Sequence, residues 1–294
     1  MNVTIIGGGY VGLVTGACLS TLGHNITIVE IFPEKVEAIN NAVPPIYEEG
    51  LEDILKSHVG QNLTASTTYE SVQTADAVFI AVGTPPNPDG SANLTYIKQA
   101  AENIADELAK AHSEYPVVVV KSTVPPGTTR DVVCKTIREK LPDLKFGCCM
   151  NPEFLREGRA VFDFMNPDRI VIGTANARAA EIMHNLYAGI DAPILDVEPT
   201  AAEMIKYTSN ALLAVSAKPV CYDPMASDAM QKLLPDAEYV DSAAAALTDA
   251  DGCLVMTEWP EFTKLNDEFN LMKTRAVIDG RHILSIPDAE GICW

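Results

Sequence analysis

Glycines near the N-terminus have the types and spacing that bind a dinucleotide. The string Gly-Gly-Gly-Tyr-Val-Gly fits a G-x-G-x-x-G turn at Gly7, Gly9 and Gly12, with Tyr10 and Val11 inside it. The first glycine allows a tight turn, the second lets the backbone approach a pyrophosphate, and the third lets helix and strand pack closely. A helix that starts here also presents its amides and positive end to the phosphates.

An acidic residue follows at the spacing expected of a ribose ligand. Glu30 ends the second expected strand, and a carboxylate there accepts hydrogen bonds from both ribose hydroxyls and repels a 2′-phosphate. This pattern predicts NAD rather than NADP. The alternative is a glycine turn followed by a surface glutamate. Lys35 is a second candidate near this ribose, and its alternative is a solvated helix lysine.

Two further side chains have the spacing of an anion site. Lys206 and Asn210 are four residues apart in an expected helix over Glu198–Val215, which Thr200 would cap. They therefore lie on one face, and both can donate to an anionic oxygen. The alternative for Lys206 is again a solvated lysine on a helix.

Short apolar segments alternate with helical ones through the first two thirds of the chain. This alternation predicts βαβ units and a parallel sheet. The expected strands are Val3–Ile6, Asn25–Glu30, Ala77–Val82, Val117–Ser122, Phe146–Met150 and Arg169–Gly173. The expected helices include Val11–Leu22, Pro33–Asn40, Tyr96–Ala111 and a segment from about Ala177 to Ala188.

The same rhythm restarts after Lys218. The expected strands are Val220–Tyr222, Glu238–Val240, Cys253–Met256 and Ala276–Ile278, and the expected helices are Met225–Leu234 and Ser242–Leu247. We therefore expect an α/β protein with an N-terminal Rossmann domain on a doubly wound parallel sheet (1–196). A shortened central helix (197–217) and a smaller, truncated Rossmann-like domain (218–294) follow.

Composition restricts the partners. The formal charge of −19 over 294 residues argues against nucleic acid and anionic membranes as ligands, although a few local donors can still hold a phosphate. We see no signal peptide and no apolar run long enough to span a bilayer. Seven irregularly spaced cysteines fit the reduced thiols of a cytoplasmic protein, and we expect no metal site.

Several longer strings resemble the UDP-glucose/GDP-mannose dehydrogenase family. The most specific is Asn-Pro-Glu-Phe-Leu-Arg-Glu-Gly over 151–158, followed by Pro-Asp-Arg over 167–169. The others lie at 45–51, 82–85, 121–129, 203–210, 222–226, 257–259 and 279–281. One departure is Glu49, where the family usually has proline.

The resemblance implies an activity and a set of residue roles. Family members oxidise the C6 hydroxyl of a nucleotide sugar to a carboxylate with two NAD, a step of polysaccharide biosynthesis. By this resemblance, Glu153 acts in acid–base steps, and Lys206 and Asn210 stabilise the oxyanion. Glu153 has an alternative as a turn cap after Asn-Pro. The remaining roles are Thr84 and Thr123 beside the cofactor, Thr123 also in catalysis, Phe154, Leu155 and Glu157 lining the substrate site, and Arg281 reaching the substrate across a dimer interface. A surface arginine is the alternative for Arg281.

A large internal block of the family pattern is missing. In the family, the helix with the lysine and asparagine continues into a long dimerisation helix, a loop with the catalytic cysteine and an aspartate, and the first strand of the C-terminal domain. Here Val215 leads directly into a string like the second strand of that domain, and no Gly-Gly-x-Cys-Phe-Pro-Lys loop occurs. The remaining strands of that domain must then close the gap or leave an unpaired edge that is prone to association. We expect weak nucleotide-sugar binding and an altered homo-oligomer interface.

Three hypotheses remain at this stage. The first is a family enzyme that keeps part of the NAD chemistry, impaired because the cysteine that attacks the aldehyde is missing. The second is an inactive NAD-binding remnant or a regulatory protein. The third is an unrelated NAD enzyme such as a 3-hydroxyacid dehydrogenase, which leaves the string at 151–158 unexplained. We expect most cysteines to be buried structural thiols. Cys221 is the cysteine nearest to the point where the internal block is missing.

Overall fold

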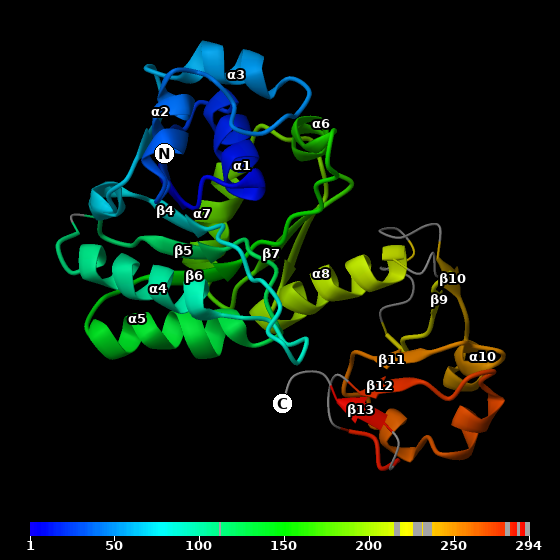
Figure 1. Cartoon of the computed structure of the whole chain (residues 1–294). Helices are drawn as coiled ribbons and strands as arrows, with labels where there is room; N and C mark the ends of the chain where they lie inside the picture. Colours follow the sequence, from blue (N-terminus) through cyan, green and yellow to red (C-terminus); the bar gives the residue numbers. More distant parts are fainter. Residues whose placement is uncertain are drawn as a thin grey trace. The chain divides into compact units, whose positions relative to one another are not determined.

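The chain folds into two compact units, Met1–Tyr207 and Thr208–Trp294. A computed structural model describes residues 1–111, 113–214, 218–225, 231, 237–279, 283–286 and 289–291 (Figure 1). Among these residues, the first unit has two buried apolar clusters and the second unit has one.

The first unit is built on an eight-stranded sheet with the order β3-β2-β1-β4-β5-β6-β7-β8. The strands are β1 (Asn2–Ile6), β2 (Asn25–Val29), β3 (Leu63–Ser66), β4 (Ala77–Ile80), β5 (Val117–Val120), β6 (Gly147–Met150), β7 (Ile170–Gly173) and β8 (Ile194–Val197). The first six run parallel, β7 runs antiparallel to β6, and β8 is parallel to β7. The expected doubly wound α/β fold is confirmed, with β3 and β8 as strands that the sequence patterns did not predict.

Helices cover both faces of this sheet (Figure 1). They are α1 (Tyr10–Thr21), α2 (Pro33–Asn40), α3 (Leu51–His58), α4 (Thr95–Leu108), α5 (Lys135–Lys140), α6 (Ala160–Met165), α7 (Ala177–Leu186) and α8 (Pro199–Ala214), with the short 3-10 helix η1 (Glu70–Thr74) and the π-helix η2 (Thr129–Cys134). Apolar side chains of α1, α3, α6 and α7 join one core cluster, and those of α4, η2 and α5 join the other. No helix among the described residues is both long and apolar enough to cross a membrane.

The central strands are uniformly apolar because they are buried on both sides. In β5, Val117 and Val119 belong to one core cluster, whereas Val118 and Val120 belong to the opposite one. Phe79 of β4 is fully buried in the first cluster. A strand covered on two faces needs no polar alternation, so a short apolar run is its sequence signature.

The second unit contains two separate small sheets among its described residues. Strand β9 (Val220–Cys221) pairs with β10 (Glu238–Tyr239), and β11 (Cys253–Val255), β12 (Val277–Asp279) and β13 (Ala289–Gly291) form the other sheet. Helix α10 (Ala243–Leu247) and the turns η3 (Phe262–Lys264) and η4 (Asp267–Leu271) complete it. The orders β10-β9 and β11-β12-β13 fit a doubly wound sheet that lacks its first, central strand. The expected helix over Met225–Leu234 lies largely outside the described residues.

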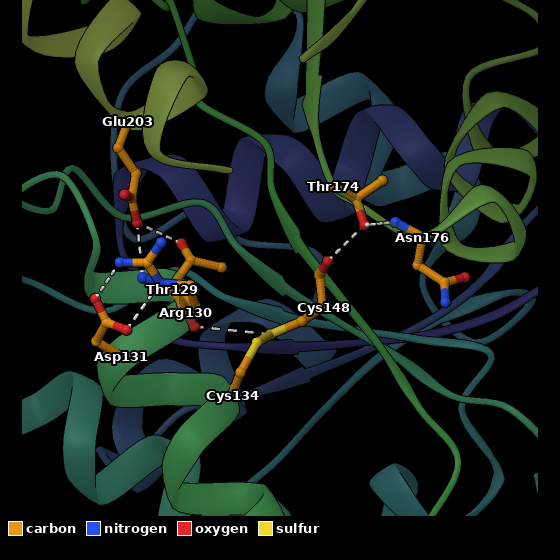
Figure 2. Close-up of a disulfide and its surroundings, with 8 residues drawn as sticks. All are labelled: Thr129, Arg130, Asp131, Cys134, Cys148, Thr174, Asn176 and Glu203. Atoms are coloured by element: carbon orange, nitrogen blue, oxygen red, sulfur yellow. Dashed lines mark hydrogen bonds and ion pairs between the residues drawn. A yellow bond between two sulfur atoms is a disulfide. The ribbon is translucent and has the colours of Figure 1, made fainter. Parts of the chain in front are cut away.

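The expectation of reduced thiols is wrong for two of the seven cysteines. Cys134, at the end of η2, and Cys148, in β6, form a disulfide (Figure 2). Their Cα atoms lie 6.2 Å apart, within the range that a disulfide spans. No sequence pattern predicts this pair, because the contact arises only when the helix packs against the sheet.

The packing of β4 generates a stability prediction. Replacing Phe79 with Ala removes a fully buried ring, and we expect a loss of about 3–5 kcal/mol in the free energy of unfolding, measured by urea titration with far-UV circular dichroism. Tyr47→Ala is the control, since Tyr47 is 88% exposed and should change stability by about 0.5 kcal/mol or less. Equal effects of the two changes would contradict the burial described here.

Candidate functional site

The turn between β1 and α1 requires glycine at two positions for steric reasons. Gly7 has φ +107°, and a Cβ on it would lie 2.5 Å from the carbonyl oxygen of Ala81. A Cβ on Gly12 would lie 1.9 Å from the carbonyl oxygen of Gly7. Helix α1 therefore packs directly on the backbone of Gly7, and Gly7 in turn packs on the backbone of Ala81, the residue after β4. The predicted roles of these two glycines in turn and packing agree with this geometry.

The space in front of Gly9, the second glycine of the motif, is open. A Cβ on Gly9 would meet no atom within 4 Å. Gly9 is the N-cap of α1, it has no side chain to cap the helix, and no acidic residue lies in the first turn. Tyr10 and Val11 follow as the first helical residues. The amides and the positive end of α1 thus face a space that suits a pyrophosphate.

Glu30 lies against this turn as the spacing predicted. Its side chain is buried, one carboxylate oxygen accepts a hydrogen bond from the Gly8 amide at 3.1 Å, and the other accepts from the Phe32 amide at 3.2 Å. The Lys35 amine lies 4.0 Å from the same carboxylate and 4.9 Å from the centre of the Phe32 ring. The two amides fix the carboxylate at the end of β2, where it can accept the hydroxyls of a ribose.

The loops after β4 and β5 are joined at the same edge of the sheet. The Thr84 hydroxyl donates to the carbonyl of Thr123 at 2.8 Å, and the Ser122 hydroxyl donates to the carbonyl of Val82 at 2.6 Å. In open α/β sheets, ligands bind outside the carboxyl ends of the strands where the strand order reverses. The structure places both predicted threonines in that region.

Glu153 and Lys206 form a largely buried ion pair. The Lys206 Nζ lies 2.9 Å from Glu153 Oε1, and the side chains are 7% and 13% exposed respectively. Glu153 Oε2 also accepts a hydrogen bond from the Leu155 amide at 2.7 Å. Glu153 therefore caps its own turn and also holds the lysine, and Lys206 is not a solvated helix lysine.

Cations also flank the aromatic ring next to this pair. The Arg169 guanidinium lies 4.7 Å and the Lys206 amine 5.5 Å from the centre of the Phe154 ring. Glu157 is exposed and Leu155 is partly buried. The site thus brings a carboxylate, an ammonium and an aromatic ring close together in space.

Two predicted substrate residues lie elsewhere. Asn210 is exposed on α8, one turn beyond Lys206, and belongs to the second unit. Arg281 lies outside the described residues.

A buried network beneath Glu153 was missed by the sequence patterns. The Lys121 amine donates to Asn151 Oδ1 at 3.0 Å, the Tyr187 hydroxyl donates to the same oxygen at 2.6 Å, and Asn151 Nδ2 donates to the carbonyl of Val171 at 2.8 Å. Burial lowers the pKa of Lys121 to about 8, although the charge of Glu153 opposes this shift. The network fixes the start of the turn that carries Glu153. Its only sequence signal was that both Lys121 and Asn151 begin strings shared with the family.

Glu48 is a second residue with an unpredicted role. Its buried carboxylate accepts hydrogen bonds from the amides of Gly158 at 2.7 Å and Ala160 at 3.0 Å. Burial alone would raise the pKa of Glu48, but these two amides keep it below its usual value. The loop that precedes α3 is thereby fastened to the end of the segment that carries Glu153.

Two domain models of one family match the chain. The NAD binding domain of the UDP-glucose/GDP-mannose dehydrogenase family matches residues 1–191, and the UDP binding domain of that family matches residues 202–286. Together they account for nearly all of the chain, and they leave no basis for the unrelated-enzyme hypothesis.

Individual relatives give the same result. The UDP-glucose 6-dehydrogenase AglM of Haloferax volcanii is 30% identical over 420 aligned positions, which cover 97% of each chain. An alignment of 420 positions to 294 residues must open gaps in this chain. The UDP-glucose 6-dehydrogenase YwqF of Bacillus subtilis is 44% identical over 217 residues, and the match spans 73% of this chain but only 48% of that protein.

Solved structures share the fold. A UDP-glucose dehydrogenase from Pyrobaculum islandicum superposes with a TM-score of 0.68 at 27% identity, covering 93% of this chain and 96% of that one. A GDP-mannose dehydrogenase from Pseudomonas aeruginosa gives a TM-score of 0.71 at 23% identity, with full coverage of both chains, and supports the fold alone.

The glycine turn and Glu30 generate a cofactor prediction. The chain should bind NAD more tightly than NADP in calorimetric titration, because the Glu30 carboxylate repels a 2′-phosphate. Glu30→Gln should weaken NAD binding and narrow the preference, because the amide has no charge to repel a 2′-phosphate and only one oxygen to accept hydrogen bonds. Glu34→Gln, on the exposed side of α2, is the matched control. Equal affinity of the unaltered chain for both cofactors would refute this prediction.

The burial of Lys121 generates a pH prediction. Its pKa is about 8 in the folded chain and about 10.5 when exposed, so the unfolded chain binds more protons between these values and stability rises with pH across that window. Lys121→Met should remove this contribution, which can reach about 1.4 kcal/mol per pH unit. Urea titrations between pH 8 and 10.5 measure it, with Lys98→Met on exposed α4 surface as the control. An unchanged pH slope in Lys121→Met would argue against the shift.

Proposed function

Because the chain belongs to the UDP-glucose/GDP-mannose dehydrogenase family, we propose that it is an NAD-dependent nucleotide-sugar dehydrogenase limited to the first oxidation step. It contains the NAD-binding domain of that family and a UDP-binding domain that implies a nucleotide-sugar ligand. The substrate we propose is UDP-glucose or a close analogue. The match to two UDP-glucose 6-dehydrogenases supports that choice.

The Glu153–Lys206 ion pair carries this proposal. Oxidation of an alcohol requires a group that takes the hydroxyl proton and a group that stabilises the resulting alkoxide. Glu153 is a carboxylate held by the Leu155 amide, and Lys206 is an ammonium directly beside it at 2.9 Å. In our proposal Glu153 accepts the proton and Lys206 stabilises the negative oxygen. NAD, which the glycine turn and Glu30 would hold, would supply the hydride acceptor for the oxidation of C6 to an aldehyde.

The second oxidation needs a nucleophile that the chain lacks at the family position. A thiolate must attack the aldehyde before the second hydride can leave. Burial raises the pKa of Cys18 and of Cys149 to about 12, so neither forms a thiolate readily. Cys134 and Cys148 are joined in a disulfide. Burial also raises the pKa of Cys221, and that of Cys253 to about 11. Among the cysteines that the structure describes, none is therefore a ready nucleophile, which supports a reaction that stops at the aldehyde. Cys293 lies outside the described residues.

The internal gap also affects ligand binding and assembly. We propose that nucleotide sugars bind weakly, because the first strand of the second domain is missing from the pocket walls. We further propose an altered homo-oligomer, a cytoplasmic location and a role in polysaccharide biosynthesis. An inactive NAD-binding regulator is the second candidate, and the gaps in the alignment to AglM favour it.

A turnover assay separates these functions. We expect UDP-glucose and NAD to release at most one NADH per sugar, with the aldehyde recovered as an adduct of an added hydroxylamine and identified by mass spectrometry. Lys206→Met should abolish this signal, because it removes the alkoxide donor, whereas Lys98→Met and Cys221→Ser should leave it unchanged.

The stoichiometry decides between the outcomes. Two NADH per sugar with a uronic acid product would mean that another group replaces the missing cysteine. NAD binding without any NADH release would instead support the regulator.

A further inference from the structure

Glu203 is a buried carboxylate that none of the proposed chemical steps uses. It lies on α8, one helical turn before Lys206, and its side chain is fully buried. Charged groups are rarely buried without partners, because desolvation of an unpaired charge is costly. Its partners therefore indicate what it does.

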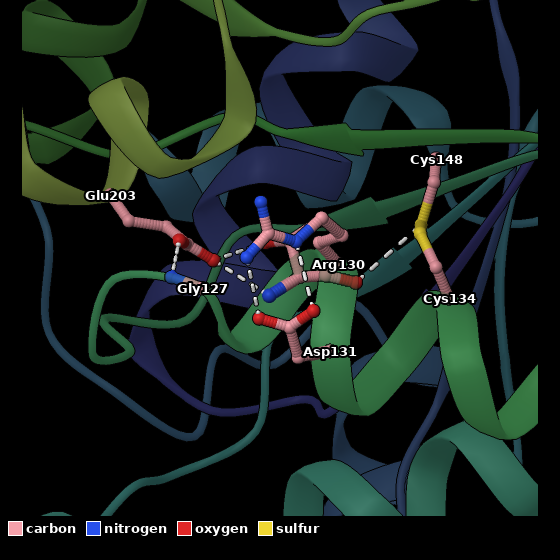
Figure 3. A network of polar contacts seen from close by, with 7 residues as sticks. Gly127, Arg130, Asp131, Cys134, Cys148 and Glu203 are labelled. Atoms are coloured by element: carbon pink, nitrogen blue, oxygen red, sulfur yellow. Dashed lines mark hydrogen bonds and ion pairs between the residues drawn. A yellow bond between two sulfur atoms is a disulfide. The ribbon is translucent and has the colours of Figure 1, made fainter. Parts of the chain in front are cut away.

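The hydrogen-bond donors to Glu203 lie in one short segment, residues 127–129. Oε1 accepts hydrogen bonds from the Thr129 amide at 2.7 Å and the Thr129 hydroxyl at 2.6 Å, and Oε2 accepts from the Gly127 amide. Figure 2 shows the contact with Thr129 and Figure 3 the contact with Gly127. Arg130, the residue after Thr129, does not pair with Glu203 but with Asp131 at 2.8 Å. Glu203 is thus held by donors at the start of a helix.

This segment is the N-terminus of a continuous helical stretch. Residues Thr129–Cys134 and Lys135–Lys140 follow each other without a break. The first amides of a helix lack partners within it, and the positive end of the helix attracts a carboxylate. Burial raises the pKa of Glu203, and the three donors oppose this rise. Glu203 therefore caps the start of this helix, as an N-cap residue of the helix itself would, and thereby attaches α8 to it.

The same helix is also fixed to the strand that leads to Glu153. The disulfide joins Cys134 to Cys148 of β6, and β6 ends at Met150, three residues before Glu153. Both members of the ion pair are therefore linked to this one helix. Glu203 connects it to Lys206, and the disulfide connects it to the strand before Glu153 (Figure 3).

We propose that Glu203 is a positioning residue. Its hydrogen bonds with Gly127 and Thr129 hold Lys206 in position next to Glu153. This inference rests on the proposed function in one respect, since it takes the Lys206–Glu153 pair as the reacting pair. It assigns to Glu203 no contact with substrate or cofactor. A purely structural role would lower stability when Glu203 is changed but would leave Lys206 in place in the folded protein.

The test uses four variants of the full chain. Glu203→Gln keeps the shape but turns an N–H toward the donors of the segment 127–129. Glu198→Gln makes the same chemical change at an exposed position just before α8. Thr129→Val removes one donor and keeps the volume, and Thr129→Ser keeps the hydroxyl.

The readout is the rate at which acetic anhydride labels Lys206, measured by peptide mass spectrometry. It is recorded below the unfolding transition of each variant. Lys206 should label slowly in the unaltered chain, because it is buried and paired. We expect about a tenfold faster rate in Glu203→Gln and a smaller increase in Thr129→Val, as Lys206 moves away from Glu153. Glu198→Gln and Thr129→Ser should match the unaltered chain, and buried Lys121, which is not on α8, should stay protected throughout.

The outcomes are decisive for Glu203 and independent of turnover. Unchanged labelling of Lys206 in folded Glu203→Gln overturns the proposal, as does equal labelling in Thr129→Val and Thr129→Ser. If Glu203→Gln does not fold, the two Thr129 variants decide alone. Labelling needs neither NAD nor sugar, so the proposed function can fail in the turnover assay while the positioning role stands.

Discussion

The site depends on the close packing of α1 against the backbone of the sheet. No side chain fits between Gly12 and the carbonyl of Gly7, or between Gly7 and the residue after β4. This contact aims the first amides of α1 at the open space in front of Gly9. It also brings the Gly8 amide within hydrogen-bonding distance of Glu30, so the phosphate and ribose ends of the cofactor site are fixed by one backbone contact.

The buried carboxylates described in the first unit are all stabilised in the same way. Its buried carboxylates bind amides at the starts of turns or helices, as Glu30, Glu48 and Glu203 do. Amide donors keep a carboxylate satisfied without requiring a second desolvated charge. The Glu153–Lys206 pair is the exception in this region, because it combines two opposite charges in one mostly buried place. Such a pair is costly unless its geometry is good, and this geometry is what the surrounding contacts maintain.

The sequence predicted local features better than contacts between distant segments. The strands at Val117 and Ala77 were recognisable because burial on both faces makes them uniformly apolar. Strand β3 was missed, because Leu63–Ser66 is short and only its first and third residues are buried. The Cys134–Cys148 bridge and the grip of Glu203 on Thr129 join residues 14 and 74 positions apart. No periodic pattern encodes such contacts, so only the folded arrangement could reveal them.

The hydrogen bonds of Glu203 also determine where the chain can be truncated to give the first unit alone. The match to the NAD binding domain ends at residue 191, whereas the compact unit continues to Tyr207. A fragment that stops at 191 would lose β8 from the edge of the sheet and would leave the amides of Gly127 and Thr129 without their acceptor. The first turns of α8 are therefore part of the dinucleotide-binding unit, although they follow its family boundary in the sequence. An autonomous fragment for ligand studies has to include them.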